Sequence, residues 1–394
     1  MAAAGVLHVT TGLNVGGAEI MLMRFLAHQD AGRFKPSVVS LMTPGPIAAH
    51  IERRGIPVTS MDMAPGKLYP ANLIGLRSAI RATVPQLYHG WMYHGNLVAS
   101  LASMANGKPA PVIWSIHHSL HDIENEKPLT ATVIKTLARM SRHAFAISYC
   151  SRIAADHHER YGFDTRRRVV IPNGVDCDEF SPGASARARL RALIDIPDAR
   201  LIIGNFARFH PMKDQVRLVE ATAQLAGRGV DVQALFIGDG HENNVLSRRA
   251  HDLGIGDRVS ILGVRTDIKD IAPGLDAFAM TSSWGESFSL AAAEAMACGV
   301  PAIVTDIGDC AWVVGDASLV ARPNDTESVA AALERLLRLT PEERRAIGLN
   351  ARARMLEHFS MREYVRRHTE LYAHAVEEGA ASRLSKGRNH ETER

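Results

Sequence analysis

The sequence contains little cysteine and little net charge, and each absence excludes a class of protein. The chain has four cysteines among its 394 residues, with no Cys-x-x-Cys pair. This pattern argues against a disulfide framework or a zinc site and favours reduced thiols in the cytoplasm. The net charge of +3 gives no indication of a nucleic-acid partner. The cysteines are Cys150, Cys177, Cys298 and Cys310.

Long apolar runs are also missing. No uninterrupted run approaches the roughly 18 to 20 residues that span a bilayer. Residues 1–9 have no basic segment ahead of their apolar residues, and a glycine-rich turn follows them. We therefore expect a buried first strand rather than a signal peptide. Any contact with a membrane is then expected to be peripheral.

What the sequence does contain is an alternation of strand and helix patterns that starts again in the second half. Apolar segments typical of strands lie at residues 5–9, 37–41, 111–116 and 144–148, then at 201–206, 232–237, 259–262 and 301–305. Helical spacing separates them, so we expect an α/β fold whose parallel sheets are covered on both faces. With 394 residues, 46% of them apolar, the chain is long enough for two domains. The Pro- and Gly-rich residues 169–183 are the best hinge candidate.

Glu286 and Glu294 lie in the most informative stretch, residues 282–301. A short apolar strand at 276–280 precedes a loop of small residues, and an alanine-rich helix is expected from about Ser289. Free N–H groups at a helix start favour an anion such as a diphosphate, and an acid one or two turns further on can reach a sugar hydroxyl. The spacing of the two acids alone also fits an ordinary amphipathic helix.

The whole stretch resembles the Glu, seven residues, Glu motif of retaining GT-B glycosyltransferases, the glycosyltransferase family 4-like enzymes of polysaccharide and lipid-glycan biosynthesis. Residues 171–176, Ile-Pro-Asn-Gly-Val-Asp, resemble the string that closes the N-terminal domain in this family. The resemblance extends from Gly12 to about Tyr372. It implies a GT-B fold, with two Rossmann-like domains whose parallel sheets face a central cleft.

The domain boundaries follow from this resemblance and from composition. We expect an N-terminal acceptor domain at residues 1–180 and a C-terminal nucleotide-sugar donor domain at residues 181–360. A helix at residues 361–378 is expected to return to the first domain. Residues 379–394 are polar, charged and poor in apolar side chains, so a disordered tail is expected there.

Arg208 and Lys213 follow the strand that ends at Phe206, and parallel sheets bind their ligands at such strand ends. An arginine fork and a lysine point charge can offset the negative charge of a departing diphosphate without a metal. The resemblance implies this catalytic role for both residues. The alternative is a pair of solvated surface cations.

Further contacts to the donor are implied by the resemblance. Glu286 would contact the donor sugar, and Glu294 would hold the ribose hydroxyls. Backbone N–H groups near Ser289 and Leu290 would assist in binding the diphosphate.

Two glycine-rich loops complete the implied donor site. Gly16 and Gly17 lack side chains, so their N–H groups can approach a phosphate or a sugar closely, and the family uses this loop to cover the donor. Gly238 ends another strand of the second half. Arg265 follows the next strand, where backbone groups in the family meet the base, and a solvated Arg265 is equally compatible with the sequence.

Two adjacent histidines, His117 and His118, follow the strand at residues 111–116. Retaining members of the family place a histidine after this strand, where it would hydrogen-bond the donor sugar or support the transition state. We assign this role to His117 because it follows the strand immediately. His118 stays open as the alternative.

Asp176 and Asp178 form an Asp-x-Asp pattern, which holds a divalent metal in GT-A enzymes. Here the pattern lies between the two domains and not after a strand that lines a nucleotide site. We therefore expect no metal site and no cofactor, since the nucleotide-diphospho-sugar is a substrate.

Two basic clusters point to an anionic surface. Residues 129–140 have an apolar helical stripe, with Lys135, Arg139 and Arg142 outside it, and residues 166–168 are three arginines. A basic amphipathic helix can rest on an anionic membrane, although such a stripe is more typical of core packing. Because the family uses lipid-linked acceptors, we expect peripheral association with the inner face of the cell membrane.

The sequence thus predicts a retaining, metal-independent hexosyl- or N-acetylhexosaminyl-transferase. The expected donor is a nucleotide-diphospho-sugar, with UDP favoured over GDP, and the expected acceptor is a glycan or a polyprenyl-diphosphate-linked glycan. No side chain stands out as a covalent nucleophile, so the default is a front-face mechanism in which the departing phosphate helps to deprotonate the acceptor. The alternatives are a GT-B epimerase or phosphorylase and a non-catalytic nucleotide-binding module.

Overall fold

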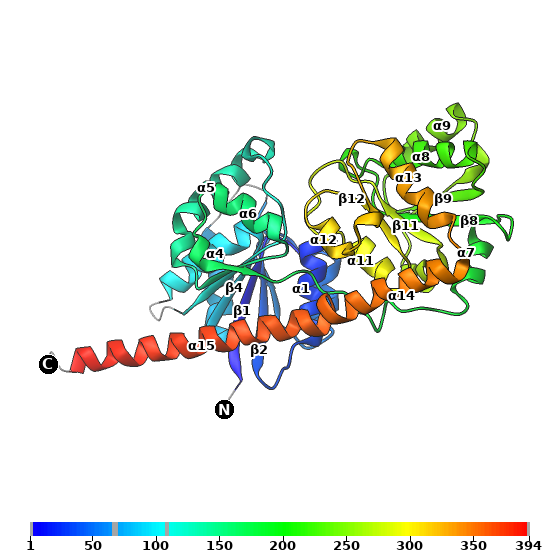
Figure 1. Cartoon of the computed structure of the whole chain (residues 1–394). Coiled ribbons are helices and arrows are strands. Elements are labelled where there is room, and N and C mark those ends of the chain that lie inside the picture. The colour runs from blue at the N-terminus through cyan, green and yellow to red at the C-terminus, as the bar shows by residue number, and fades with distance from the viewer. Residues whose placement is uncertain (1–2, 65–69, 107–109, 392–394) are drawn as a thin grey trace. The chain divides into compact units, whose positions relative to one another are not determined.

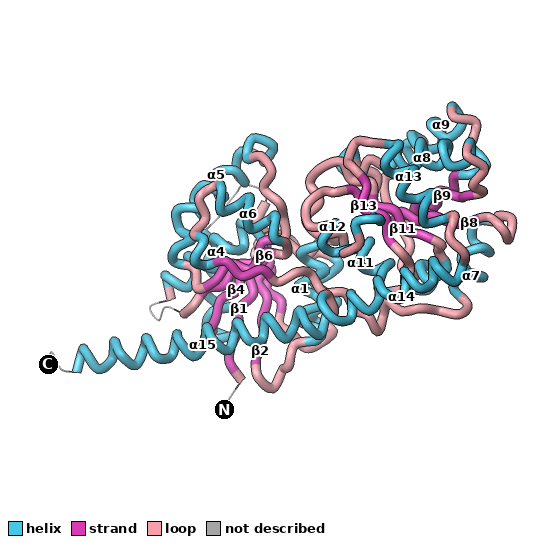
Figure 2. Tube along the Cα trace, viewed as in Figure 1, coloured by secondary structure: helices cyan, strands magenta, loops and turns pink. Residues whose placement is uncertain are grey.

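The chain forms two compact units, Met1–Asn173 with Met361–Arg394 (unit 1) and Gly174–Ser360 (unit 2). The computed structural model describes residues 3–64, 70–106 and 110–391, leaving aside the side chains of residues 70–73 and 382–391. Each unit contains one parallel sheet with helices packed around it (Figure 1, Figure 2). The prediction of an α/β fold with two Rossmann-like parallel sheets is confirmed.

The sheet of unit 1 has seven strands in the order β3-β2-β1-β4-β5-β6-β7. All seven residues of β1 are buried, as expected for a central parallel strand that is covered on both faces. From β1 the chain continues to β2 on one side and later returns to β4 on the other, so the strand order reverses between β1 and β4. The strands are β1 (Ala4–Thr10), β2 (Phe34–Ser40), β3 (Val58–Ser60), β4 (Leu87–Trp91), β5 (Val112–Ile116), β6 (Ala146–Tyr149) and β7 (Arg168–Val170).

Seven α-helices of the described residues belong to unit 1. The last of them, α15, packs on α1 through His368 and Tyr372, whose rings lie 5.2 and 5.7 Å from that of Phe25. The helices are α1 (Gly17–His28), α2 (Pro46–Glu52), α3 (Pro70–Thr83), α4 (Met92–Ala105), α5 (Pro128–Met140), α6 (Arg152–Arg160) and α15 (Met361–Glu391).

Helix α15 is longer than the sequence led us to expect. We placed its end at residue 378 and a disordered tail at 379–394, whereas the helix continues to Glu391. The physical reason is that residues 379–391 contain no proline and several strong helix formers. The helix can therefore continue beyond the residues that pack on α1.

The sheet of unit 2 has six strands in the order β10-β9-β8-β11-β12-β13, and here the order reverses between β8 and β11. Its strands are β8 (Leu201–Phe206), β9 (Val232–Ile237), β10 (Val259–Leu262), β11 (Ala277–Met280), β12 (Ala302–Thr305) and β13 (Val320–Ala321). Its helices are α7 (Ala186–Ile194), α8 (Gln215–Gly227), α9 (Val245–Asp252), α10 (Ile268–Ile271), α11 (Leu290–Ala297), α12 (Cys310–Val314), α13 (Thr326–Leu337) and α14 (Pro341–His358).

The division between the units falls seven residues before the boundary that we placed after residue 180. Residues 174–180 are already attached to unit 2, because Val175 N donates to Phe359 O at 2.7 Å. The Arg352 guanidinium of α14 also donates to the carbonyl oxygens of Cys177 and Phe180, at 3.1 and 3.0 Å. These backbone contacts are not visible in the composition of the segment.

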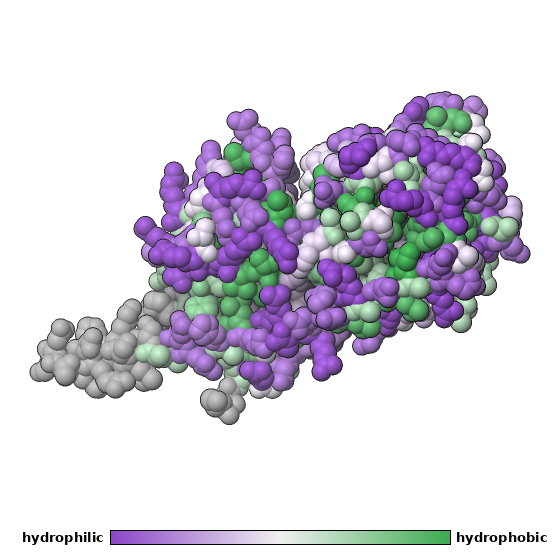
Figure 3. All heavy atoms as spheres, in the orientation of Figure 1, coloured by the Kyte–Doolittle hydropathy of each residue, from purple (hydrophilic) through white to green (hydrophobic). Residues whose placement is uncertain are grey.

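The surface and the cysteines add two observations. Hydrophilic residues cover much of the face in Figure 3, with smaller apolar areas between them. No described helix is long and apolar enough to cross a membrane. All four cysteines are buried free thiols, in agreement with the expectation of reduced thiols.

Candidate active site

The candidate site of unit 2 lies where the strand order of its sheet reverses. Strands β8 and β11 are neighbours, and the loops that follow them carry Lys213 and Glu286 respectively. In open α/β sheets, ligands bind outside the carboxyl ends of the strands at such a reversal. The topology therefore brings together residues that are separated by 73 positions in the chain.

Lys213 and Glu286 form an ion pair at this position. Lys213 Nζ lies 2.5 Å from Glu286 Oε2, and their side chains are only 19% and 10% exposed. Ser282 Oγ donates a second hydrogen bond to the same carboxylate oxygen at 2.9 Å. The carboxylate is thus held by two donors and cannot rotate freely.

The two loops that carry this pair are also hydrogen-bonded to each other. Ser283 N donates to Met212 O at 2.9 Å, and Thr281 Oγ1 donates to Lys213 O at 3.1 Å. Gly285 has φ of +72°, and a Cβ there would lie 2.6 Å from Met212 Sδ. Glycine suits this position because side chains rarely adopt such a φ, and an added Cβ would also require the Met212 side chain to move.

Arg208 lies in the same loop as Lys213, but its side chain is exposed. Gly238 sets the position of this backbone, since it has φ of +157° and a Cβ there would lie 2.2 Å from Ala207 O. The Arg208 guanidinium makes no hydrogen bond or ion pair with any residue that the structure describes. It is therefore available to a ligand.

His210 lies between the two cations in the sequence. Desolvation lowers the pKa of His210, and the charges of Arg208 and Lys213 lower it further. Both cations are therefore close to one imidazole, which makes this loop a local positive centre. His210 Nδ1 also accepts a hydrogen bond from Met212 N at 3.1 Å, which requires that this nitrogen carries no proton.

Helix α11 begins where the sequence predicted. Ser289 is its N-cap, and its Oγ accepts a hydrogen bond from Ala292 N at 3.4 Å. Leu290 is the first helical residue, so N–H groups at this end point towards the loop that carries Glu286. Glu294 is partly buried one turn into the helix.

Gly308 is part of the same site and was missed from the sequence. It has φ of +60°, and a Cβ there would lie 2.0 Å from Glu286 O. The loop after β12 therefore packs directly on the backbone of Glu286, and Asp309 N donates to Ser287 O at 3.2 Å. The signal that could have revealed it is a glycine shortly after the strand at 302–305.

Arg265 differs from Arg208 because its guanidinium already has a partner. The Arg265 guanidinium forms a bidentate ion pair with the Asp267 carboxylate, with hydrogen bonds of 2.8 and 2.6 Å. Its strand, β10, is separated from β8 by β9 in the sheet. A contact of Arg265 with the base stays a prediction.

In unit 1, His117 follows β5 at the carboxyl edge of the sheet. Its ring stacks on Trp91 at 5.3 Å with an interplanar angle of 8°, and Nδ1 lies 3.0 Å from Asn173 Oδ1. Burial lowers the pKa of His117 to about 4, although the hydrogen bond to Asn173 opposes this shift. The ring is therefore neutral near pH 7, with its proton on Nδ1 and a lone pair on Nε2.

His118 has a different environment. Its Nε2 lies 2.9 Å from Glu126 Oε1, and the side chain is 39% exposed. The hydrogen bond from His118 lowers the pKa of Glu126. An imidazole that is occupied by a carboxylate is less suited to a neutral sugar hydroxyl than the unoccupied Nε2 of His117.

The glycine loop of unit 1 connects β1 to α1. Gly16 is the N-cap of α1, and a Cβ there would lie 2.4 Å from Glu19 Oε2. Around Gly17 a Cβ would meet nothing within 4 Å, so no protein contact requires glycine there. Burial raises the pKa of Glu19. The roles of Gly16 and Gly17 in covering the donor stay predictions.

Asp176 and Asp178 are used within their own turn. Asp176 Oδ1 accepts hydrogen bonds from Asp178 N and Glu179 N, at 3.1 and 3.0 Å. In the part of the chain that the structure describes, no three His, Cys, Asp or Glu side chains are arranged to hold a metal ion. The Asp176 side chain thus has a structural role within its own turn.

The two basic clusters differ in their surroundings. Val133, Ile134 and Leu137 of the apolar stripe are buried on the inner face of α5. Arg166 pairs with Asp164 at 2.7 Å. Arg168 pairs with Asp156 at 2.7 Å and with Glu159 at 3.1 Å, whereas Lys135, Arg139 and Arg142 are exposed. Association with a membrane stays a prediction.

Further residues near the pair were not singled out from the sequence. Ser282 is fully buried beneath Glu286, whereas Trp284 is 51% exposed beside it. The Trp284 ring lies 6.2 Å from that of His210 in an edge-on arrangement. A tryptophan and a serine within four residues of Glu286 were visible in the sequence, but only the structure shows which of them is buried.

Two family models match the chain, one in each half. The model described as Glycosyltransferase Family 4 matches residues 15–179, and the model described as Glycosyl transferases group 1 matches residues 187–354. The two matches together indicate that the chain is a glycosyltransferase with the GT-B fold.

Individual relatives agree with this assignment. EpsF of Bacillus subtilis is 29% identical over 314 residues, which are 76% of this chain and 79% of EpsF. The D-inositol 3-phosphate glycosyltransferase of Salinispora tropica is 27% identical over 370 residues, which are 87% of this chain and 75% of that enzyme.

Among solved structures, Anabaena HepE in complex with UDP and glucose has a TM-score of 0.79 at 23% identity, and covers 93% of this chain and 99% of HepE. A glycosyltransferase from Rickettsia africae has a TM-score of 0.81 at 19% identity, with 95% and 99% of the two chains covered. These likenesses show a shared fold.

Proposed function

We propose that this glycosyltransferase moves a sugar from a nucleotide-diphospho-sugar to a glycan or lipid-linked acceptor and retains the anomeric configuration. The observation that carries the proposal is the Lys213–Glu286 ion pair, which lies at the strand reversal of unit 2 next to the unoccupied guanidinium of Arg208. The structural neighbour HepE, solved with UDP and glucose, favours UDP as the nucleotide.

In this proposal the positive loop of unit 2 binds the diphosphate. Arg208 and Lys213 would offset the charge that develops on the departing phosphate, and the N–H groups at the start of α11 would contribute the rest. These groups supply the positive charge that a divalent ion supplies elsewhere. Transfer should therefore persist in excess EDTA, and loss of activity that added Mg²⁺ or Mn²⁺ restores would overturn this point.

The remaining residues would position the sugar and the ribose. Glu286, fixed by Lys213 and Ser282, would accept hydrogen bonds from the donor sugar, and Glu294 would hold the ribose hydroxyls. The Nε2 lone pair of His117 would accept a hydrogen bond from a further sugar hydroxyl. Glu286 is already held by Lys213 and Ser282, so we infer that it positions the sugar rather than attacking the anomeric carbon, and a front-face displacement assisted by the departing phosphate would then account for retention.

A screen of nucleotide-sugars would test the proposal. The full chain is incubated with UDP- and GDP-sugars and with candidate acceptors, products are detected by mass, and the anomeric configuration is read by NMR. A product that retains the donor configuration supports the proposal. Inversion would overturn the stereochemical part, and the absence of transfer and of hydrolysis with every donor would overturn the enzymatic reading in favour of a binding module.

A further inference from the structure

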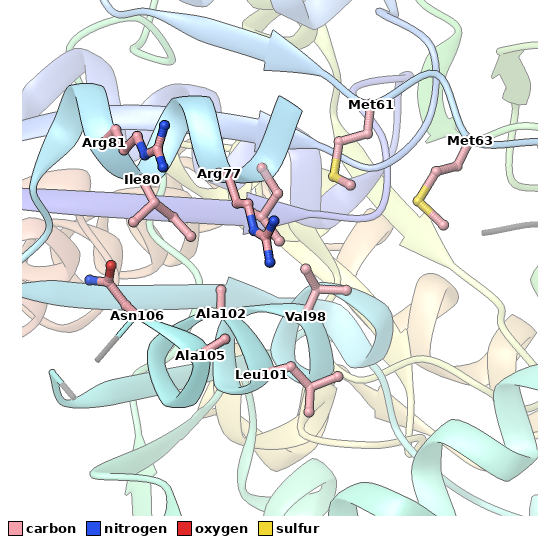
Figure 4. Close-up of a pocket in the computed structure, with 11 residues that line it drawn as sticks. Met61, Met63, Arg77, Ile80, Arg81, Val98, Leu101, Ala102, Ala105 and Asn106 are labelled. Atoms are coloured by element: carbon pink, nitrogen blue, oxygen red, sulfur yellow. The ribbon is translucent and has the colours of Figure 1, made fainter. Parts of the chain in front are cut away.

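A cavity of about 400 Å³ lies in unit 1 between α3 and α4, beside the chain that leaves β3 (Figure 4). Long apolar side chains form most of its wall. These are Met61 and Met63 after β3, Leu76 and Ile80 from α3, and Val98 and Leu101 from α4. Small residues of α4, among them Ala102, leave the space open.

Among the described residues that line the cavity, Arg77 and Arg81 of α3 are the charged ones, and none is acidic. They are four residues apart and therefore lie on one face of the helix. Figure 4 shows the Arg77 guanidinium extending towards α4, near Val98 and Ala102. Both side chains are exposed, and neither forms a hydrogen bond or ion pair with a residue that the structure describes.

The apolar character continues outside the cavity. Ile74 of α3 is 70% exposed, and Leu101 and Met104 of α4 are 50% and 69% exposed. Protein interiors are normally close-packed, so an unfilled space of this size is unusual. Large apolar side chains that cluster at a protein surface commonly mark a binding site. The two helices thus present an unfilled apolar space with an apolar border and a positive entrance.

We propose that this cavity binds a single-chain amphiphile that carries a phosphate group. The apolar wall excludes a sugar or a nucleotide, which would leave polar groups unpaired. An apolar cavity of about 150 Å³ holds benzene, so this one has room for a chain of roughly 15 carbons. Two guanidinium groups, at a lining with no acidic side chain among its described residues, match the charge and the oxygen geometry of a phosphate.

None of the described residues that line this cavity is among those assigned to the transfer reaction. The lining residues belong to α3, α4 and the segment after β3, and the measurement is of binding rather than of transfer. Binding is therefore measured directly and does not depend on an active donor site. A prenyl phosphate and a straight-chain alkyl phosphate share the required chemistry, and the experiment separates them.

Calorimetric titration of the full chain with farnesyl phosphate and with dodecyl phosphate, each below its micelle concentration, would test the proposal. Farnesol lacks the anion and inorganic phosphate lacks the chain, and each should bind at least tenfold more weakly than the intact amphiphile. The tighter of the two phosphates identifies the chain type. Charged hydrogen bonds contribute about 1.5–3 kcal/mol each, so Arg77→Gln and Arg81→Gln should each weaken binding about tenfold or more.

Ala102→Phe tests the cavity itself, because Ala102 is 3% exposed and a ring there would occupy the space. Binding should fall at least tenfold, while the thermal midpoint checks that the fold is intact. Arg139→Gln on α5, also exposed, is the matched charge control and should bind as the wild type does.

Three outcomes would overturn the proposal. The first is no measurable binding of either phosphate, and the second is binding that neither arginine variant weakens. The third is attachment to anionic phospholipid vesicles without any binding of the free amphiphiles, which would identify the surface as a membrane contact. The exposed arginines are not part of the core, so their variants remain decisive even where Ala102→Phe fails to fold.

Discussion

Lys213 Nζ and Glu286 Oε2 lie 2.5 Å apart, although the two residues come from loops that follow different strands. The ion pair means that the lysine charge is already partly compensated before any ligand is present. A diphosphate that binds beside Arg208 would then share Lys213 with the carboxylate. The pair couples the phosphate site to the sugar site, because a shift of the lysine towards the phosphate also moves the hydrogen-bond partner of Glu286.

Replacement of Lys213 by alanine should lower kcat by a factor of about 10² or more. The charge interacts more strongly with the departing diphosphate than with the intact donor, so the transition state loses more than the ground state. Steady-state kinetics with the donor identified in the screen would measure this effect.

Lys269→Ala is the matched control. Lys269 Nζ lies 3.2 Å from Glu179 Oε1, and both side chains are more than 40% exposed, so its removal should change kcat less than about twofold. Near-normal turnover of Lys213→Ala would reject Lys213 as a phosphate ligand.

Ser282→Ala should reduce kcat/KM by roughly tenfold without loss of the fold. The hydroxyl donates to Glu286 Oε2 at 2.9 Å, and a hydrogen bond to a charged group contributes about 1.5–3 kcal/mol. Ser283→Ala, which changes the neighbouring hydroxyl, is the control. Equal activities of the two variants would show that Ser282 does not position Glu286.

Glu294 is proposed to hold the ribose, and deoxynucleotides make that assignment specific. Glu294→Ala should weaken UDP binding about tenfold, and 2′- or 3′-deoxy-UDP should bind the wild type more weakly by a similar factor. If the carboxylate meets that hydroxyl, the two losses will not add, as in a double-mutant cycle. Additive losses would place Glu294 elsewhere, and Glu242→Ala, which removes an exposed carboxylate, provides the baseline.

The parallel sheets and the start of the key helix could be predicted because each depends on local pattern. Buried parallel strands are continuous apolar segments, and Ser289 before an alanine-rich stretch is a recognisable N-cap. The same holds for the position of Lys213, which follows from the rule that ligands bind at strand ends. The ion pair with Glu286 did not follow, because it depends on which strands are neighbours in the sheet.

Other features depend on contacts between residues distant in the chain. The attachment of residues 174–180 to unit 2 rests on Arg352 and Phe359, more than 170 positions away. Glycine is needed at position 308 because a Cβ there would meet the backbone oxygen of Glu286. It is needed at position 238 because a Cβ there would meet the backbone oxygen of Ala207. Composition reveals that a loop is flexible in principle, but it cannot reveal what the loop packs against.

The stability of unit 1 should depend on pH, because three buried histidines lie together between its sheet and α15. His8 of β1 and His89 of β4 have ring centroids 5.4 Å apart, and His368 of α15 lies 5.9 Å from His89. All three are fully buried. Burial lowers the pKa of His8 and that of His368 from 6.5 to about 3, and the charge of His368 adds to the shift of His8.

The sign of the effect follows from proton uptake. Below pH 6.5 the unfolded chain binds protons at His8 and His368 that the folded unit does not bind. The free energy of unfolding therefore decreases as the pH is lowered from 6.5 to about 3. Well below pH 6.5 each histidine contributes about 1.4 kcal/mol per pH unit, and because the unfolded imidazole is only half protonated at pH 6.5 itself, His8 and His368 together should remove about 3 kcal/mol between pH 6.5 and pH 5. His89, whose pKa burial also lowers well below 6.5, adds to this dependence. His368→Leu should therefore remove at most about a third of the effect of the three histidines, whereas His50→Leu on the exposed face of α2 should not change it. Native-state hydrogen exchange of β1 and β4, corrected for the intrinsic rate, would measure the effect. A stability that is constant from pH 7 to pH 5 would show that these histidines are protonated in the folded unit.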